Sequence, residues 1–181
     1  MKLLIVGHAR HGKDTVAEYF ESKYGLQFAS SSMHNAEHTV FPVLAPLYGY
    51  KTVEECFEDR GNHRSEWYDL IAARCKDDPA TIGREIFEIS DIYAGLRNKR
   101  EFHGIKNAGL IDCAIWVDRS DHLPPEDKSS MSLEPWMTDY VIDNNGTLEQ
   151  LYQAIDTLYY TLAYQFDRID HEYTMRPWKA C

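Results

Sequence analysis

The sequence predicts an α/β fold in which one parallel sheet is covered by helices on both faces. Short apolar runs alternate along the chain with longer segments of helical character. Residues 2–6 read as a strand buried on both faces, because the apolar residues Leu3-Leu4-Ile5-Val6 follow one another without alternation. The chain has 181 residues, of which 44% are hydrophobic, and this is enough for one domain with a core.

Strands and helices are expected to alternate along most of the chain. Strands are expected at residues 2–6, 26–29, 91–95, 113–117 and 139–142. Helices are expected at residues 13–24, 52–77, 79–88 and 99–107, and from residue 148 onward. Thr52 with Glu55 forms a capping box, Gly61 interrupts the second helix, and Thr147 caps the last one. Helices between parallel strands are what a doubly covered sheet requires.

Three further signals mark helix ends. Ser30-Ser31-Ser32 is a cluster of residues that favour the first position of a helix. Pro79 fits the first turn of the helix that follows it. Gly109 closes the helix over residues 99–107.

We expect one domain over residues 1–166. Residues 34–89 form a mostly helical region, and residues 118–135, rich in proline, serine and charge, form a mobile loop. Residues 167–181 are weakly patterned and read as a tail.

Charge and cysteine usage exclude several classes. The net charge of −10 argues against a general attraction to nucleic acid, although Arg97-Asn98-Lys99-Arg100 is a local positive run. The four cysteines lack a C-x-x-C pair, which argues against a disulfide framework or a four-sulfur zinc site. No apolar run approaches the ~18 residues of a membrane span. The opening apolar run ends at Gly7, too early for a signal peptide, so we expect an intracellular, soluble protein.

The stretch GHARHGKDT, directly after the first strand, carries the strongest chemical signal. Gly7 and Gly12 bracket four residues and Lys13 follows, which is the P-loop arrangement between a strand and a helix. We call residues 7–12 the glycine loop. Glycines let the backbone approach phosphates, consecutive N–H groups cradle the oxygens, and Lys13 reaches the terminal phosphates. The simpler alternative is a glycine-rich turn that caps a helix.

ATP and Mg²⁺ are the expected ligands of this stretch. In the common pattern a Ser or Thr directly after the lysine holds Mg²⁺, whereas here Asp14 intervenes before Thr15. Asp14 through water, or Thr15, is expected to take that role. The residues expected to contact ATP are Gly7, His8, Ala9, Arg10, His11, Gly12, Lys13, Asp14 and Thr15.

His34-Asn35-Ala36-Glu37-His38 spells H-x-x-E-H, the pattern of an inverted zinc-protease helix. A zinc hydrolase is the least favoured function, because Pro42 and Pro46 should shorten this helix and a further acidic ligand is needed.

Beyond these motifs, the chain resembles bacteriophage P-loop nucleotide kinases of the thymidylate kinase and deoxynucleoside monophosphate kinase type. The resemblance spans roughly residues 2–160. It rests on Gly12-Lys13-Asp14-Thr15, on Asp91 to Phe102, on Ile115 to Arg119, and on Asp139 to Leu148. It implies a P-loop NTPase fold with a helical acceptor-side insertion and a lid, which we call the lid loop (residues 118–135).

The resemblance also implies roles for residues. Lys13, Asp14, Arg97 and Arg119 are the implied catalytic residues, and Ser32, Arg64 and Arg84 are the implied acceptor-binding residues. An ion pair of Arg97 with Asp91 or Glu101 is the alternative for that arginine. Trp67 and Tyr68 either stack on a base or pack in the core, and packing is favoured.

Two departures bear on the acceptor. Gly95 stands where the family has an Asp that helps to anchor the metal, and the lid loop carries one Arg and one Lys among more numerous acids. Monophosphate acceptors need several arginines, because guanidinium groups neutralise and align phosphates.

The family includes enzymes that phosphorylate 5-hydroxymethyluracil (5-hmdU) in phage DNA, a step of thymine hypermodification. A modified deoxynucleotide in DNA is therefore the preferred acceptor, and the infected host cytoplasm the expected location. Free deoxynucleoside monophosphates are the alternative. A P-loop ATPase or switch without an acceptor is less favoured.

Overall fold

A computed structural model describes residues 1–174 of the chain, with side chains described through residue 166. It contains one five-stranded sheet in the order β2-β3-β1-β4-β5, in which every neighbouring pair is parallel. The strands are β1 (Leu3–Val6), β2 (Phe28–Ser30), β3 (Ile92–Ala94), β4 (Cys113–Asp118) and β5 (Tyr140–Asp143). The α/β fold class with a parallel sheet is confirmed.

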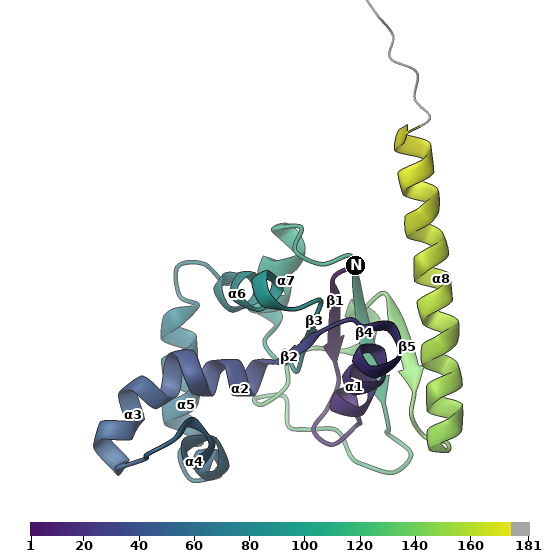
Figure 1. Ribbon diagram of the computed structural model, residues 1–181. Helices are drawn as coiled ribbons and strands as arrows, with labels where there is room; N and C mark the ends of the chain where they lie inside the picture. Colours follow the sequence, from purple (N-terminus) through teal and green to yellow (C-terminus); the bar gives the residue numbers. More distant parts are fainter. Residues whose placement is uncertain (175–181) are drawn as a thin grey trace, which may run out of the picture.

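Helices cover both faces of this sheet (Figure 1). They are α1 (Lys13–Tyr24), α2 (Ser31–Asn35), α3 (Phe41–Tyr48), α4 (Val53–Glu58), α5 (Arg64–Arg74), α6 (Thr81–Ile89), α7 (Lys99–Asn107) and α8 (Leu148–Thr174). Three short segments complete them: a π-helix at Ala36–Val40 and 3₁₀ turns at Asp59–Gly61 and Pro135–Met137.

Successive side chains of β1 point to opposite faces of the sheet and so lie in two different cores. Leu3 and Ile5 pack with α1 and α8 on one face, whereas Leu4 and Val6 pack with α6 and α7 on the other. All four side chains are fully buried. A strand that feeds two cores must be apolar at every position, which explains the uninterrupted run at the start of the sequence.

A third, smaller core lies among α2 to α5. It contains Leu44, Cys56 and Trp67, and the half-buried Ile71 packs against both this core and the sheet core beneath α6 and α7. Figure 1 shows these helices gathered at one side of the sheet, with α8 at the opposite side. The helical region predicted from the sequence therefore has packing of its own.

Several predicted ends are confirmed. Residues 13–24 and 99–107 are helical over the predicted ranges. Thr52 accepts a hydrogen bond from the Glu55 amide, and Thr147 forms a reciprocal capping pair with Gln150. The second strand begins two residues later than predicted, at Phe28.

The prediction that prolines shorten the helix around residues 34–38 was wrong. The chain stays helical from Ser31 to Tyr48, through the π-helix and into α3. Pro42 lies in the first turn of α3, where a missing N–H is tolerated, and only Pro46 is internal.

Two further boundaries differ from the predictions. Pro79 precedes the cap residue Ala80 of α6 rather than lying in its first turn, and Asp78 accepts a hydrogen bond from the Ala80 amide. Helix α8 crosses the predicted boundary at residue 166 and runs to Thr174; residues 175–181 lie outside the described part. None of the described helices combines the length and apolarity that crossing a bilayer requires.

Candidate functional site

The glycine loop joins the end of β1 to the start of α1 in an unusual backbone conformation. Gly7 has a φ of +146°, Arg10 of +63° and Gly12 of +94°. Gly12 is the cap residue of α1, and Lys13 is its first helical residue. Such turns direct N–H groups toward one concave side, next to the positive end of the helix.

Both glycines are required by close packing as well as by φ. A Cβ on Gly7 would lie 2.5 Å from the Val117 carbonyl oxygen, and one on Gly12 would lie 2.3 Å from Asn144 Nδ2. The same Asn144 amide donates a hydrogen bond of 2.8 Å to the His11 carbonyl. The loop is therefore held between the carboxyl ends of β4 and β5.

Lys13 lies folded against the glycine loop. Only 9% of the residue is exposed, and its ammonium donates a hydrogen bond of 2.7 Å to the His8 carbonyl. Burial lowers the pKa of Lys13 and nearby Arg97 lowers it further, whereas Asp14 and Glu126 oppose the shift. A buried ammonium among few acids is suited to bind a multiply charged anion.

Asp14 and Thr15 follow in the first turn of α1. Asp14 is exposed and Thr15 is half-buried. A carboxylate and a hydroxyl beside Lys13 are oxygen donors of the kind that Mg²⁺ binds together with phosphates and water, so these residues fit the predicted metal.

The lid loop lies directly on the glycine loop. The Glu126 carboxylate accepts a hydrogen bond of 2.6 Å from the Ala9 amide and forms an ion pair with Arg97. The Glu126 amide donates to His8 Nδ1 at 3.2 Å, and the Arg119 amide donates to His11 Nδ1 at 3.0 Å. Two backbone amides and one carboxylate thus fasten the lid loop to the glycine loop.

The two histidines form a ring cluster with Trp116 beneath the lid loop. The His8 ring is edge-on to both His11 and Trp116, with centroids 5.2 Å apart in each pair. Both Nδ1 atoms accept N–H groups, so each ring carries its proton on Nε2. His11 Nε2 and Trp116 Nε1 are buried without a hydrogen-bond partner.

Burial lowers the pKa of both histidines. For His8 the proximity of His11 and Lys13 adds to this effect, and Glu126 and Glu134 oppose it. For His11 the Asp118 carboxylate opposes it, whereas Lys13 adds to it.

Arg97 has a different partner from the two that the sequence suggested. It pairs with Glu126, and neither Asp91 nor Glu101 contacts it; Asp91 pairs with Lys2 instead. Glu101 is largely buried, and this raises its pKa to about 7.

Gly95 was expected to replace an Asp of the kinases that the sequence resembles. Its φ of +98° is a conformation that a side chain disfavours, and the Ser31 hydroxyl donates to its carbonyl at 3.1 Å. The backbone conformation at this point therefore favours glycine over a residue with a side chain.

Arg119 follows β4 and is half-buried, and its guanidinium forms no ion pair with any described residue. The neighbouring Asp118 carboxylate accepts hydrogen bonds from Ser120 and Asn145 rather than orienting Arg119. The backbone of Arg119 thus contacts the glycine loop through His11, and its guanidinium is free of ion pairs with described residues.

The three implied acceptor-binding residues are not brought into contact with one another. The Ser32 hydroxyl shares a hydrogen bond of 3.0 Å with Ser30, and Arg84 is exposed and paired with Asp78. Arg64, at the start of α5, is exposed.

The two aromatic candidates for base stacking differ in their burial. Trp67 is buried in the small helical core, with its ring edge-on to Phe57, whereas Tyr68 is 61% exposed. The packing alternative is what the structure shows for Trp67.

The H-x-x-E-H segment serves the packing of helices. His34 is buried and its Nε2 lies 2.9 Å from Glu85 on α6, whereas His38 is exposed. Glu85 also pairs with Arg74, which in turn donates to Thr39. Among the side chains that the structure describes, no group of three or more from His, Cys, Asp or Glu is placed to hold a metal ion.

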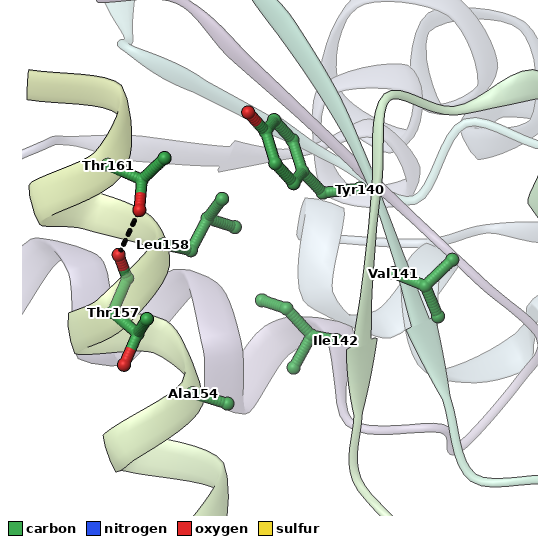
Figure 2. Close-up of a pocket in the computed structure, with 7 residues that line it drawn as sticks. All are labelled: Tyr140, Val141, Ile142, Ala154, Thr157, Leu158 and Thr161. Carbon is green, nitrogen blue, oxygen red and sulfur yellow. Dashed lines mark hydrogen bonds between the residues drawn. The ribbon is translucent and has the colours of Figure 1, made fainter. Parts of the chain in front are cut away.

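A shallow groove of about 320 Å³ lies elsewhere, between β5 and α8 (Figure 2). It is lined by Tyr140, Val141, Ile142, Ala154, Thr157, Leu158 and Thr161. The Thr161 hydroxyl already donates to the Thr157 carbonyl, and no charged side chain lines the groove. These residues do not suit an anion, so the glycine loop remains the candidate site.

Three residues at the site were missed by the sequence analysis. Glu126 was one acid among several in a loop, and Trp116 was part of an apolar strand. Asn144 lay within the stretch Asp139 to Leu148 that carries the resemblance, without a role of its own. Their positions depend on contacts between distant segments, although the end of a strand beside the glycine loop was a usable signal for Trp116.

Solved structures to which this chain is similar are kinases by name. Shikimate kinase from Aquifex aeolicus vf5 has a TM-score of 0.52 and 12% identity, covering 91% of this chain and 99% of that chain. Shikimate kinase from Bacteroides thetaiotaomicron has a TM-score of 0.48 and 10% identity, covering 90% of this chain and 98% of that chain. A gluconokinase from Sinorhizobium meliloti 1021 has a TM-score of 0.46 and 14% identity, covering 91% of this chain and 96% of that chain.

No protein-family model matches the chain, and no curated protein matches it. At 12% identity the likeness to the Aquifex aeolicus structure concerns the fold. With the sheet order and the strand–loop–helix unit, it establishes a P-loop NTPase fold.

Proposed function

We propose that the chain is an ATP-dependent kinase whose glycine loop and Lys13 bind the triphosphate. The observation that carries the proposal is the loop between β1 and α1, with three left-handed residues and a buried ammonium at its helical end. Backbone N–H groups and a cation in this arrangement stabilise charge on phosphate oxygens. The Aquifex aeolicus structure with this fold is named a kinase, which supports the same reaction class.

Other residues at the site fit the same reaction. Asp14 and Thr15 would hold Mg²⁺, which neutralises charge on the phosphates when bound. Arg119 is the proposed residue that closes on the transferring group, because its guanidinium is unpaired. In the transfer, an acceptor hydroxyl oxygen forms a bond to the γ-phosphorus, the bond to the ADP oxygen breaks, and the hydroxyl proton is released.

A kinase is favoured over a P-loop ATPase or switch by the lid loop. The Arg119 and Glu126 amides both reach the histidines of the glycine loop, so the lid loop is able to cover bound phosphates. A cover that excludes water protects ATP from hydrolysis and favours transfer to an acceptor.

The arginines support a hydroxyl acceptor over a phosphate acceptor. Most arginines near the helical region already have partners. Arg74 and Arg84 form ion pairs with Glu85 and Asp78. Arg60 donates to the Phe57 carbonyl and lies over its ring, and Arg100 donates to the Lys76 carbonyl. Arg64 remains free among the described residues of this region. Arg119 is assigned to the transferring group, so the helical region offers a single free arginine, which is few for the phosphate of a monophosphate substrate, whereas a neutral hydroxyl needs none.

We further propose the hydroxymethyl group of 5-hydroxymethyluracil in DNA as that hydroxyl. The resemblance to phage kinases and the scarcity of free arginines favour it. The base would have to leave the stack to reach the glycine loop.

Free deoxynucleoside monophosphates are the second candidate. The net charge of −10 favours them, because DNA binding usually needs a positive surface.

The test is a transfer assay with γ-labelled ATP and Mg²⁺. Its arms contain DNA with 5-hydroxymethyluracil, the same DNA with thymine, each free monophosphate, or no acceptor. Label on the modified DNA alone is expected, and label in nucleoside diphosphates would replace that acceptor. Phosphate release alone in every arm would contradict the kinase proposal.

The test variant for this assay is Lys13→Met, which removes the ammonium and keeps much of the buried volume. Transfer should fall ~10³-fold or more. Lys51→Met, the same substitution at an exposed position outside the glycine loop, is the matched control and should retain wild-type transfer.

A further inference from the structure

The Glu126 carboxylate lies where the proposed function places phosphate oxygens. One of its oxygens accepts the Ala9 amide at 2.6 Å, and the other pairs with Arg97. Only 15% of the Glu126 side chain is exposed, so this is an inserted group and not a solvated surface acid.

The groups around this carboxylate are the ones that an anion from outside would use. Ala9 belongs to the glycine loop, and the charges of Lys13 and Arg97 both act on Glu126. Burial alone would raise the pKa of Glu126, but the Arg97 hydrogen bond and charge, the Ala9 amide and Lys13 hold it below its ordinary value. The carboxylate is therefore ionised at neutral pH and acts as an anion on these donors.

The backbone at Glu126 is fastened to the same loop. Its amide donates to His8 Nδ1, and the carboxylate of the same residue accepts the Ala9 amide. Glu126 therefore contacts the glycine loop through both its backbone and its side chain.

We propose that Glu126 is a built-in competitor of the triphosphate, which must leave the Ala9 amide and Arg97 before a phosphate group can take them. This inference rests on the proposed function, since it concerns the same site. Nucleotide entry is then coupled to movement of the lid loop and to release of Arg97, which becomes free to contact phosphate.

Calorimetric titration of the full chain with a non-hydrolysable ATP analogue and Mg²⁺ tests the competition. Glu126→Gln keeps the size of the side chain and removes its charge, so the analogue should bind ~10-fold more tightly than to the wild type. Inorganic tripolyphosphate should show the same gain, because the competition concerns phosphates and not the base.

Asp121→Asn is the matched control, because it removes one charge from an exposed side chain of the same lid loop. Its affinity should equal that of the wild type, which separates the local contact from a change in net charge. Glu126→Ala serves as a second variant should the glutamine variant fail to fold, and it should also bind more tightly.

The outcomes separate this inference from the proposed function. Equal affinity of the wild type and both Glu126 variants, or weaker binding by those variants, overturns the competitor while leaving the phosphate site intact. Absence of binding by every protein, the wild type included, overturns the proposed function itself.

Discussion

At the scale of single residues, two positions of the glycine loop have no room for any residue other than glycine. Gly12 faces the Asn144 amide and Gly7 faces the Val117 carbonyl, so any side chain at either position meets another segment. Lys13 is the opposite case, since burial of its ammonium lowers its pKa and costs stability that a bound anion would restore. These features fit a backbone arranged for a ligand more than for its own stability.

Gly12→Ala should destabilise the fold more than Gly49→Ala. Both glycines have positive φ, but Gly49 at the end of α3 has open space around it, whereas a Cβ at Gly12 would clash with Asn144 at 2.3 Å. The difference in unfolding free energy should be about 1–3 kcal/mol, a typical cost of overpacking. Urea unfolding of the two variants measures it, and equal losses would show that the clash relaxes without cost.

Arg119→Met should lower kcat and leave nucleotide affinity almost unchanged. A guanidinium that acts on the transferring group is typically responsible for ~10³-fold in rate, and it contributes little before the transition state. Steady-state kinetics with a parallel binding titration distinguish the two effects. A variant that loses affinity but retains kcat would place Arg119 in ground-state binding.

At the scale of elements, the contact between the glycine loop and the lid loop is the least expected feature. Two lid amides donate to ring nitrogens of His8 and His11, and these acceptors exist only while the rings are neutral. Since burial lowers the pKa of both histidines, the folded protein disfavours their protonation.

The contribution of these two histidines to the free energy of unfolding should therefore fall as the pH drops below about 6.5, the ordinary pKa of histidine. With a lowered pKa in the folded state, the unfolded state binds more protons over this range, so protonation favours unfolding. Thermal unfolding between pH 7.5 and 5 should show a steeper loss for the wild type than for His8→Gln/His11→Gln. Parallel profiles would mean that these two rings do not carry the effect.

Element positions were predictable where local chemistry decides them. The helices at residues 13–24 and 99–107 have clear stop signals, glycines at residues 25 and 109, and the structure keeps both ranges. Pro42 misled the prediction, because a π-helix leads into α3 and brings this proline to a first turn. The register of a helix around a proline is set by packing, which the local sequence does not show.

At the scale of the whole molecule, the sheet and the loop at its edge followed from sequence, but the surroundings of the loop did not. The strands β1, β4 and β5 bring Val117, Asn144 and Gly7 together across more than a hundred residues of chain. Glu126 reaches Arg97 in the same way. Ion pairs of this kind depend on the folded arrangement, and they decide which arginines remain free for an acceptor.

Backbone amide chemical shifts provide the most direct test of the central claim, that the glycine loop binds a triphosphate. Adding inorganic tripolyphosphate to isotope-labelled protein should shift the amides of residues 7–15 most, with saturation at one equivalent. Unchanged amides in this stretch, with shifts gathered at the groove between β5 and α8 or elsewhere, would contradict the account.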